Sequence, residues 1–257
     1  MDLELAGRTI VVTGGTNGIG LATAELLVAE GANVSVCGRD ADRLAAAQQR
    51  LGENALVTQA DVLDADDMRQ LMTATRDRFG SIDGLVNNAG QSRMSTYATT
   101  SDDAWRDELE LKFFGLLHAT RAAEDALRAS PIGSIVNMNA VLARQPEGRL
   151  VATSAARAGA LNLTKSLAAE LAPDIRVNAI LLGLIDSGQW SRRFEAAETD
   201  LDYDAWCAEL AADRGVPLGR LGQPDEVAPT VALLLSPRSA FTTGAAYEIA
   251  GGVSRGI

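Results

Sequence analysis

The chain is poor in the residues that build disulfide frameworks, metal clusters and membrane spans. Among its 257 residues are only two cysteines, Cys37 and Cys207, and one histidine, His118. Two cysteines are too few for a disulfide framework or a zinc cluster, so we expect a reducing compartment and no metal site. No apolar run reaches the length of a membrane span. Residues 1–7 include two acidic residues and contain no hydrophobic h-region of a signal peptide, which favours a cytoplasmic location.

The balance of charge and hydrophobicity is typical of one soluble folded domain. Acidic residues outnumber basic ones by 34 to 23, and the net charge is −11. Nucleic acids and anionic membranes bind basic surfaces, so we expect neither as a partner. A hydrophobic fraction of 47% is enough for the core of a single large α/β domain over residues 1–257.

Buried-strand patterns alternate with helical stretches along the chain. This rhythm predicts a doubly wound parallel sheet flanked by helices on both faces, with ligands at the carboxyl ends of the strands. We expect strands at residues 9–13, 33–37, 56–59, 84–87, 133–137, 176–181 and 246–249, and helices at 18–30, 40–51, 65–79, 153–171 and 224–235. Residues 186–219 break the rhythm with mixed polar and aromatic residues, which predicts a helical insertion or lid over the site.

A glycine-rich turn, T-G-G-T-N-G-I-G at residues 13–20, separates the first predicted strand from the first predicted helix. Gly14, Gly18 and Gly20 have no Cβ, so the backbone can turn sharply and approach an anion. Free N–H groups at the start of the helix then face the phosphates of a ligand. The same turn contains Thr16, Asn17 and Ile19. We predict a phosphate-binding unit here; the alternative is a tight loop without a ligand.

The end of the second predicted strand, V-C-G-R-D, indicates which dinucleotide binds. In a dinucleotide fold an acidic residue at this place accepts hydrogen bonds from a ribose 2′-hydroxyl, whereas an arginine pairs with a 2′-phosphate. Here Gly38 removes the acid and Arg39 supplies a cation, with Arg43 one helical turn further on. We therefore predict NADP(H) rather than NAD(H); an ordinary surface arginine is the alternative reading of Arg39.

Several further segments, in the same order along the chain, resemble the short-chain dehydrogenase/reductases. The glycine turn is similar to their T-G-x-x-x-G-I-G, Asp61-Val62 to their adenine-contacting pair, and Asn87-Asn88-Ala89-Gly90 to their N-N-A-G. R-V-N-A-I at 176–180 and G-R-L-G-Q-P-D-E-V-A at 219–228 resemble later segments of the family. The resemblance implies a Rossmann-type seven-stranded sheet, a nicotinamide cofactor, a small-molecule substrate and a homotetramer or homodimer. It also implies cofactor contacts at Asp61, Val62, Asn88, Ala89 and Gly90.

The catalytic residues of the family are replaced in this chain. The run that aligns with the family's Y-x-x-x-K is Thr153-Ser154-Ala155-Ala156-Arg157. The position of the carbonyl-orienting serine is Ala140, preceded by Asn139, and the asparagine of the middle helix is Lys112. After the sixth strand the family's P-G is Leu182-Gly183, followed by Ile185 and Ser187, which we expect to contact the carboxamide and pyrophosphate ends of the cofactor.

The replaced residues can still form a reaction centre of another kind. A threonine hydroxyl is a much poorer acid than a phenol, and a guanidinium keeps its proton at ordinary pH, so Lys112 is the best remaining proton donor. We expect Arg157 to hold the nicotinamide ribose as a fixed cation, and Asn139 and Thr153 to hydrogen-bond the substrate oxygen. The alternatives are that Lys112 is a solvated helix lysine and that Thr153 is a helix N-cap.

The sequence gives less information about the substrate and leaves more than one function open. Aromatic residues of the insertion can line an apolar pocket or pack within the lid: Trp190, Phe194, Tyr203 and Trp206. Arginines near the same mouth make an anionic substrate conceivable: Arg144, Arg149, Arg192 and Arg193. We expect an NADP(H)-dependent oxidoreductase that acts on a carbonyl or alcohol through a non-standard centre. A catalytically silent NADPH-binding sensor or oligomer partner is the alternative, and a non-redox lyase or isomerase is a third.

Overall fold

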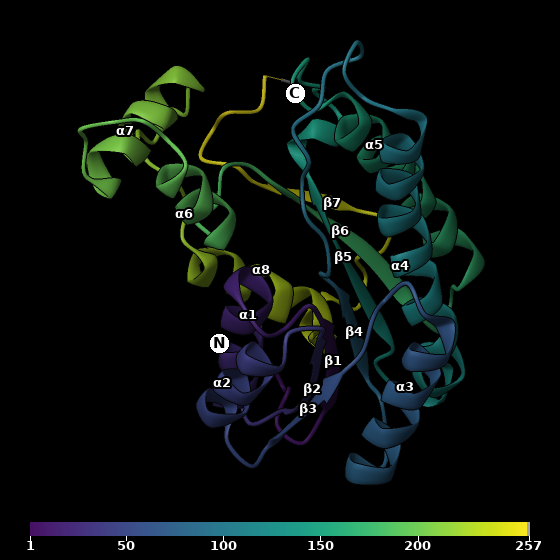
Figure 1. Cartoon of the computed structure of the whole chain (residues 1–257). Helices are drawn as coiled ribbons and strands as arrows, with labels where there is room; N and C mark the ends of the chain where they lie inside the picture. Colours follow the sequence, from purple (N-terminus) through teal and green to yellow (C-terminus); the bar gives the residue numbers. More distant parts are fainter. Residues whose placement is uncertain (256–257) are drawn as a thin grey trace.

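A seven-stranded, all-parallel sheet forms the middle layer of the protein. The computed structural model describes residues 1–255, and its strands lie in the order β3-β2-β1-β4-β5-β6-β7 (Figure 1). The strands are β1 Thr9–Thr13, β2 Asn33–Gly38, β3 Ala55–Gln59, β4 Gly84–Asn87, β5 Ser134–Ala140, β6 Arg176–Leu182 and β7 Ala246–Ile249. The order reverses between β1 and β4, which creates a crevice at the carboxyl ends of these two strands. The predicted doubly wound Rossmann-type sheet is thus confirmed.

Helices cover both faces of the sheet. They are α1 Gly18–Ala29, α2 Ala41–Leu51, α3 Ala65–Phe79, α4 Asp102–Ala129, α5 Val151–Glu170, α6 Gly188–Glu195, α7 Tyr203–Asp213 and α8 Pro224–Leu235. Helices α1, α2 and α8 lie on one face, and α3, α4 and α5 lie on the other (Figure 1). Each face has its own cluster of buried apolar side chains, because successive side chains of a strand point to opposite faces.

Two element boundaries near the site differ from the prediction. Strand β5 continues to Ala140, and its last residues, Asn139 and Ala140, pair with Leu181 and Leu182 of β6. The prediction ended this strand at residue 137, where the run of apolar side chains stops. Backbone pairing with β6 does not depend on apolar side chains, and it continues for three more residues. Helix α5 begins at Val151 rather than at residue 153, so Thr153 lies inside the first turn and its interpretation as an N-cap is wrong.

Helices α6 and α7 belong to neither layer and lie to one side of the carboxyl ends of the strands (Figure 1). Both fall within the predicted insertion, residues 186–219, which we call the lid segment. Phe194 of α6 packs against Tyr203 and Trp206 of α7, with ring centroids 5.3 and 5.7 Å apart. Most of the lid aromatics thus contact one another. No helix within residues 1–255 combines the length and hydropathy that crossing a bilayer requires.

The carboxyl end of α8 is held to the sheet by one arginine. Arg176, the first residue of β6, donates hydrogen bonds to the carbonyl oxygens of Leu234 (2.9 Å), Ser236 (3.2 Å) and Thr242 (3.3 Å). Carbonyl groups at a helix end lack intrahelical partners and carry the negative end of the helix dipole. A part-buried guanidinium therefore satisfies several acceptors that water reaches poorly.

We expect Arg176→Met to lower the free energy of unfolding by about 2–4 kcal/mol, because charge-assisted hydrogen bonds are lost and buried carbonyls stay unpaired. Arg50→Met is the matched control, since Arg50 pairs with Glu25 on the exposed surface and such pairs contribute about 0–1 kcal/mol. Urea denaturation of both variants measures the difference. Equal stabilities would show that Arg176 does not hold the end of α8.

Candidate active site

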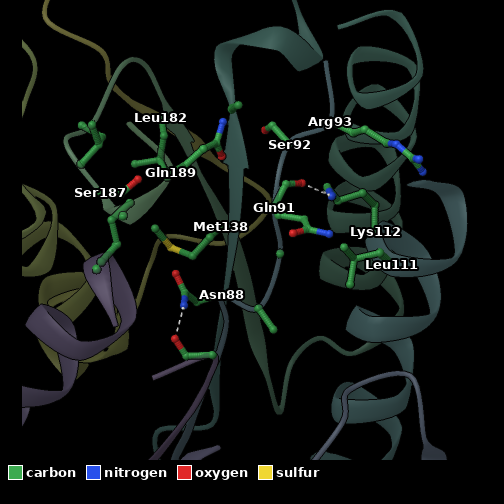
Figure 2. A pocket seen from close by; sticks show the side chains of 18 of the residues that line it. Asn88, Gln91, Ser92, Arg93, Leu111, Lys112, Met138, Leu182, Ser187 and Gln189 are labelled. Carbon is green, nitrogen blue, oxygen red and sulfur yellow. Dashed lines mark hydrogen bonds between the residues drawn. The ribbon is translucent and has the colours of Figure 1, made fainter. Parts of the chain in front are cut away.

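A large crevice runs along the carboxyl ends of the strands. It encloses a cavity of about 640 Å³, lined by the glycine turn after β1, by the loops after β2, β3, β4 and β6, by the end of β5 and by one side of α4. Figure 2 shows Lys112 and Leu111 of α4 on one side of the crevice and Met138, Leu182 and Ser187 across from them. The crevice lies where the strand order reverses, the usual binding place in open α/β sheets.

The glycine turn packs directly against the loop after β4. Gly14 and Gly18 have φ values of 63° and 54°, which favour glycine. A Cβ at Gly14 would lie 2.9 Å from the Cα of Ala89, and one at Gly20 would lie 2.4 Å from the oxygen of Gly14. The amide nitrogen of Asn88 donates to the carbonyl oxygens of Thr13 and Gly14, each at 3.0 Å. The asparagine thereby fixes the turn from the neighbouring strand (Figure 2).

The far end of the crevice has a cation where many dinucleotide folds have an acid. A Cβ at Gly38 would lie 2.9 Å from the hydroxyl oxygen of Thr16, so an acidic side chain at this position would require Thr16 to shift. Arg39 lines the cavity and lies 3.5 Å from Asp61 in an exposed ion pair. Arg43 lines the same end of the cavity. The charges at this end can therefore receive an anionic group.

Leaving aside the predicted catalytic residues, fourteen of the residues predicted to contact the cofactor line this crevice. They are Gly14, Thr16, Asn17, Gly18, Ile19, Arg39, Asp61, Val62, Asn88, Ala89, Gly90, Gly183, Ile185 and Ser187. Three of the four predicted catalytic residues line it too: Lys112, Asn139 and Arg157. Gly20 and Thr153 do not; Gly20 packs beneath the turn, and the hydroxyl of Thr153 is buried behind α4.

Lys112 is buried between α4 and the loop after β4. Its side chain is only 6% exposed, so the interpretation of a solvated helix lysine is wrong. Its Nζ donates to the carbonyl oxygen of Gln91 at 2.6 Å (Figure 2) and lies 3.6 Å from Oε2 of Glu108, one helical turn earlier. The ammonium group therefore has one neutral and one anionic partner and still faces the cavity.

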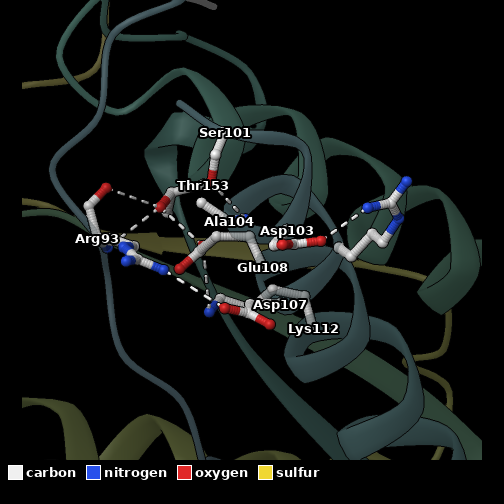
Figure 3. Close-up of polar contacts among 9 residues, drawn as sticks. Arg93, Ser101, Asp103, Ala104, Asp107, Glu108, Lys112 and Thr153 are labelled. Atoms are coloured by element: carbon white, nitrogen blue, oxygen red, sulfur yellow. Dashed lines mark hydrogen bonds and ion pairs between the residues drawn. The ribbon is translucent and has the colours of Figure 1, made fainter. Parts of the chain in front are cut away.

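Glu108 links the two helices that meet at this place. The hydroxyl of Thr153 on α5 donates to Oε2 of Glu108 at 2.8 Å, and the backbone nitrogen of Arg93 donates to the same hydroxyl at 3.3 Å (Figure 3). Glu108 is itself only 4% exposed. Thr153 therefore lies against a carboxylate, and the space in front of it is taken by the side chain of Glu108.

Arg157 completes the cluster from α5, one helical turn after Thr153. Its Nε is buried and has no hydrogen-bond partner among the described residues. Its backbone oxygen accepts from the amide of Asn139 at 3.0 Å, and Oδ1 of Asn139 accepts from the nitrogen of Ala140. The amide of Asn139 is thus partly used to join the end of β5 to α5.

The cluster has an excess of positive charge. Burial and the neighbouring Arg157 lower the pKa of Lys112 to about 8, although Glu108 opposes the shift. Burial also lowers the pKa of Arg157 to about 10, again against the attraction of Glu108. Two cations thus share one carboxylate where water is scarce, and the lysine releases its proton first. An ammonium with a pKa this close to neutrality can act as a general acid.

Sequence reasoning missed Glu108, although the sequence contains a signal for it. Glu108 and Lys112 are spaced i, i+4, so they lie on one face of α4. That face continues through Leu116, Ala119 and Ala123, all buried. Two opposite charges on an otherwise buried helical stripe indicate a buried ion pair. The contact of Lys112 with the backbone oxygen of Gln91 could not be predicted in this way, because every residue has a backbone oxygen.

Several aromatic and basic residues near the crevice lie away from the cluster of Glu108, Lys112 and Arg157. Tyr97 is 85% exposed and does not line the crevice. His118 packs against Phe114, with its Nδ1 3.2 Å from the carbonyl oxygen of Val62. Arg144 pairs with Glu248 at 2.8 Å and, like Arg149, does not line the crevice. Of the lid residues named, Trp190, Arg192 and Arg193 do line it.

The chain matches a family model over almost all of its length. The model, described as enoyl-(acyl carrier protein) reductase, matches residues 14–254. A 3-oxoacyl-(acyl-carrier-protein) reductase of Vibrio harveyi is 32% identical over 252 residues, which cover 98% of this chain and 99% of the relative.

Two solved structures share both fold and sequence with the chain. A short-chain oxidoreductase from Pseudomonas aeruginosa PAO1, bound to NADPH and containing an atypical catalytic centre, is 49% identical with a TM-score of 0.92; the match covers 97% of this chain and 98% of that one. The L-sorbose reductase of Gluconobacter frateurii, complexed with NADPH and L-sorbose, is 30% identical with a TM-score of 0.93 over the full length of both chains. Together with the fold and the glycine cradle, these matches show that the chain belongs to the short-chain dehydrogenase/reductase family, as a member whose usual catalytic residues are replaced.

Proposed function

We propose that this protein is an NADP(H)-dependent oxidoreductase that interconverts a carbonyl compound and its alcohol, with Lys112 as the proton donor. The observation that carries the proposal is the buried cluster of Glu108, Lys112 and Arg157 on the wall of the crevice that the glycine cradle opens. Relatives with the same fold support it, because the similar structures from Pseudomonas aeruginosa and Gluconobacter frateurii hold NADPH.

The residues of the crevice fit a phosphorylated dinucleotide. Gly14 and Gly18 present backbone without side chains, and a Cβ at Gly14 would obstruct the close approach of the turn to the loop after β4. Arg39 and Arg43 offer cations for a 2′-phosphate, and Thr16 lies close to the place of a competing acid. At the other end, Gly183 and Ile185 would contact the carboxamide side, and Arg157 the ribose. Bound NADPH supplies a hydride to the carbonyl carbon of the substrate.

Lys112 supplies the proton that the carbonyl oxygen takes up. Its Nζ has three N–H donors; one is used by the oxygen of Gln91, and Glu108 lies 3.6 Å away, which leaves a donor for a substrate oxygen in the cavity. Before the proton is transferred, Lys112 and Arg157 together carry two positive charges against the single negative charge of Glu108. This excess positive charge stabilises negative charge that develops on the substrate oxygen. After transfer the neutral amine leaves a balanced pair of Arg157 and Glu108.

Glu108 and Thr153 act as positioning residues in this scheme. Oε2 of Glu108 lies between the hydroxyl of Thr153 and the ammonium of Lys112, so Thr153 fixes the carboxylate and the carboxylate orients the lysine. Thr153 therefore acts through Glu108 and not on the substrate. Asn139 keeps one N–H of its amide beyond the bond to Arg157, so it stays the candidate for orienting the substrate oxygen.

Lys112→Met tests the proton donor, and Lys165→Met is its matched control, because Lys165 lies on the outer side of α5 and donates only to the oxygen of Gly244. We expect Lys112→Met to lower kcat/KM for reduction by about 10²- to 10⁴-fold, the range for loss of a general acid. NADPH affinity and the activity of Lys165→Met should remain close to wild type. The assay is the loss of NADPH absorbance with a panel of ketones, aldehydes and imines.

The same assay separates the proposed enzyme from a silent NADPH sensor. A wild-type chain that binds NADPH but consumes none with any member of the panel would favour the sensor. Full turnover by Lys112→Met would remove the lysine from the mechanism while leaving the cofactor proposal intact.

The pH dependence of reduction gives a second test. A general acid must carry its proton, so the reduction rate should be constant below the pKa of Lys112, about 8, and fall as the pH rises through it. Glu108 raises this pKa; Glu108→Gln should therefore move the fall to lower pH while the hydrogen bond from Thr153 persists. Steady-state rates from pH 6 to 10 measure both profiles. Coincident profiles for wild type and Glu108→Gln would contradict the positioning role.

A further inference from the structure

The lid segment carries an arginine that points back into the crevice. Arg192 lies one helical turn after Gly188, the first residue of α6. Side chains of a helix lean toward its amino end, and the Nη1 of Arg192 accordingly lies 3.3 Å from the position that a Cβ on Gly188 would occupy. The side chain lines the cavity. It forms no hydrogen bond or ion pair with any of residues 1–255.

Arg192 converges with the glycine turn on one region of the crevice. The Nδ2 of Asn17 lies 3.2 Å from the same Cβ position over Gly188, so the guanidinium and the amide meet there. The Oδ1 of Asn17 accepts from the nitrogen of Gly18 at 2.7 Å and so begins α1. A Cβ on Gly18 would lie 3.7 Å from the Cβ of Ser187. The start of the lid therefore touches the part of the turn that faces the phosphates of a dinucleotide.

The positive charge of Arg192 is not neutralised by a neighbouring carboxylate within residues 1–255, so this side chain can bind an anionic group of a ligand. No carboxylate of the described residues pairs with Arg192, whereas most other arginines of the crevice have a partner: Arg39 with Asp61, Arg93 with Asp107 and Arg214 with Glu147. Its neighbour Arg193 also lines the crevice but stacks on Trp190, with its guanidinium carbon 4.5 Å from the ring centroid. A guanidinium with free forked donors beside the glycine turn matches the geometry of phosphate oxygens.

We propose that Arg192 binds the diphosphate of the dinucleotide cofactor and thereby holds the lid segment over the crevice. The inference rests on the proposed NADP(H) site. None of the residues of α6 is buried, whereas the later part of the lid segment is anchored by buried Val216 and by the ion pair of Arg214 with Glu147. A charge-assisted bond to the cofactor adds a contact at α6 itself. Cofactor binding and lid closure are then coupled through one side chain.

Calorimetry with two ligands tests this assignment. NADPH contains the diphosphate, and adenosine 2′-monophosphate contains only the 2′-phosphate end. We expect Arg192→Met to weaken NADPH about 10-fold or more while the affinity for adenosine 2′-monophosphate changes less than about 2-fold. Arg192→Lys should retain part of the NADPH affinity, since it keeps the charge but loses the fork. Arg121→Met, an exposed position on α4, controls for the loss of one positive charge.

Hydrogen exchange of α6 gives the lid readout. NADPH should slow amide exchange in residues 188–195 of the wild-type and Arg121→Met proteins, and should have little effect on them in Arg192→Met. Unchanged NADPH affinity in Arg192→Met, or equal losses for both ligands, would overturn the assignment. A wild-type chain that binds adenosine 2′-monophosphate but not NADPH, or neither ligand, would overturn the proposed function and this inference with it.

Discussion

The buried cluster on the crevice wall depends on one carboxylate, that of Glu108, shared between two helices. On α4, Glu108 and Lys112 are one turn apart; on α5, Thr153 and Arg157 are one turn apart in the same way. The carboxylate contacts Thr153 and Lys112 and attracts Arg157. Burying a lysine and an arginine without an anion would cost several kcal/mol per charge, and Glu108 offsets part of that cost.

The two helices also explain how a changed set of residues can replace the usual one. A tyrosine and a lysine on one helix are exchanged for a threonine and an arginine, and neither replacement can release a proton near neutral pH. In the proposed scheme the acid comes from the facing helix, where Lys112 is buried and carries a lowered pKa. The same arginine that replaces the lysine contributes to that lowering. In the proposed scheme the substitutions are therefore coupled.

The fold and the cofactor crevice could be predicted from the sequence because their signals are local. Gly14 lies between a strand and a helix at a position where backbone approach requires glycine, and Gly18 begins that helix with a positive φ. Asn88 follows the strand that neighbours β1. The hydroxyl of Thr153 was expected at the substrate because its chain position aligns with a tyrosine. The side chain of Thr153 is shorter than that of a tyrosine, and Glu108, 45 positions away in the sequence, fills the space that this leaves. Such a contact between α4 and α5 depends on packing that no local pattern encodes.

Titration of the lysine side chains tests the central claim most directly. The chain has two lysines, Lys112 and Lys165, so protein labelled with carbon-13 at lysine Cε gives two resonances, and Lys112→Met assigns them. The account predicts that Lys112 titrates near pH 8 and that Glu108→Gln lowers its pKa further. A Lys112 resonance that titrates near pH 10 or above would show that no buried, coupled ammonium exists at this site and would contradict the account.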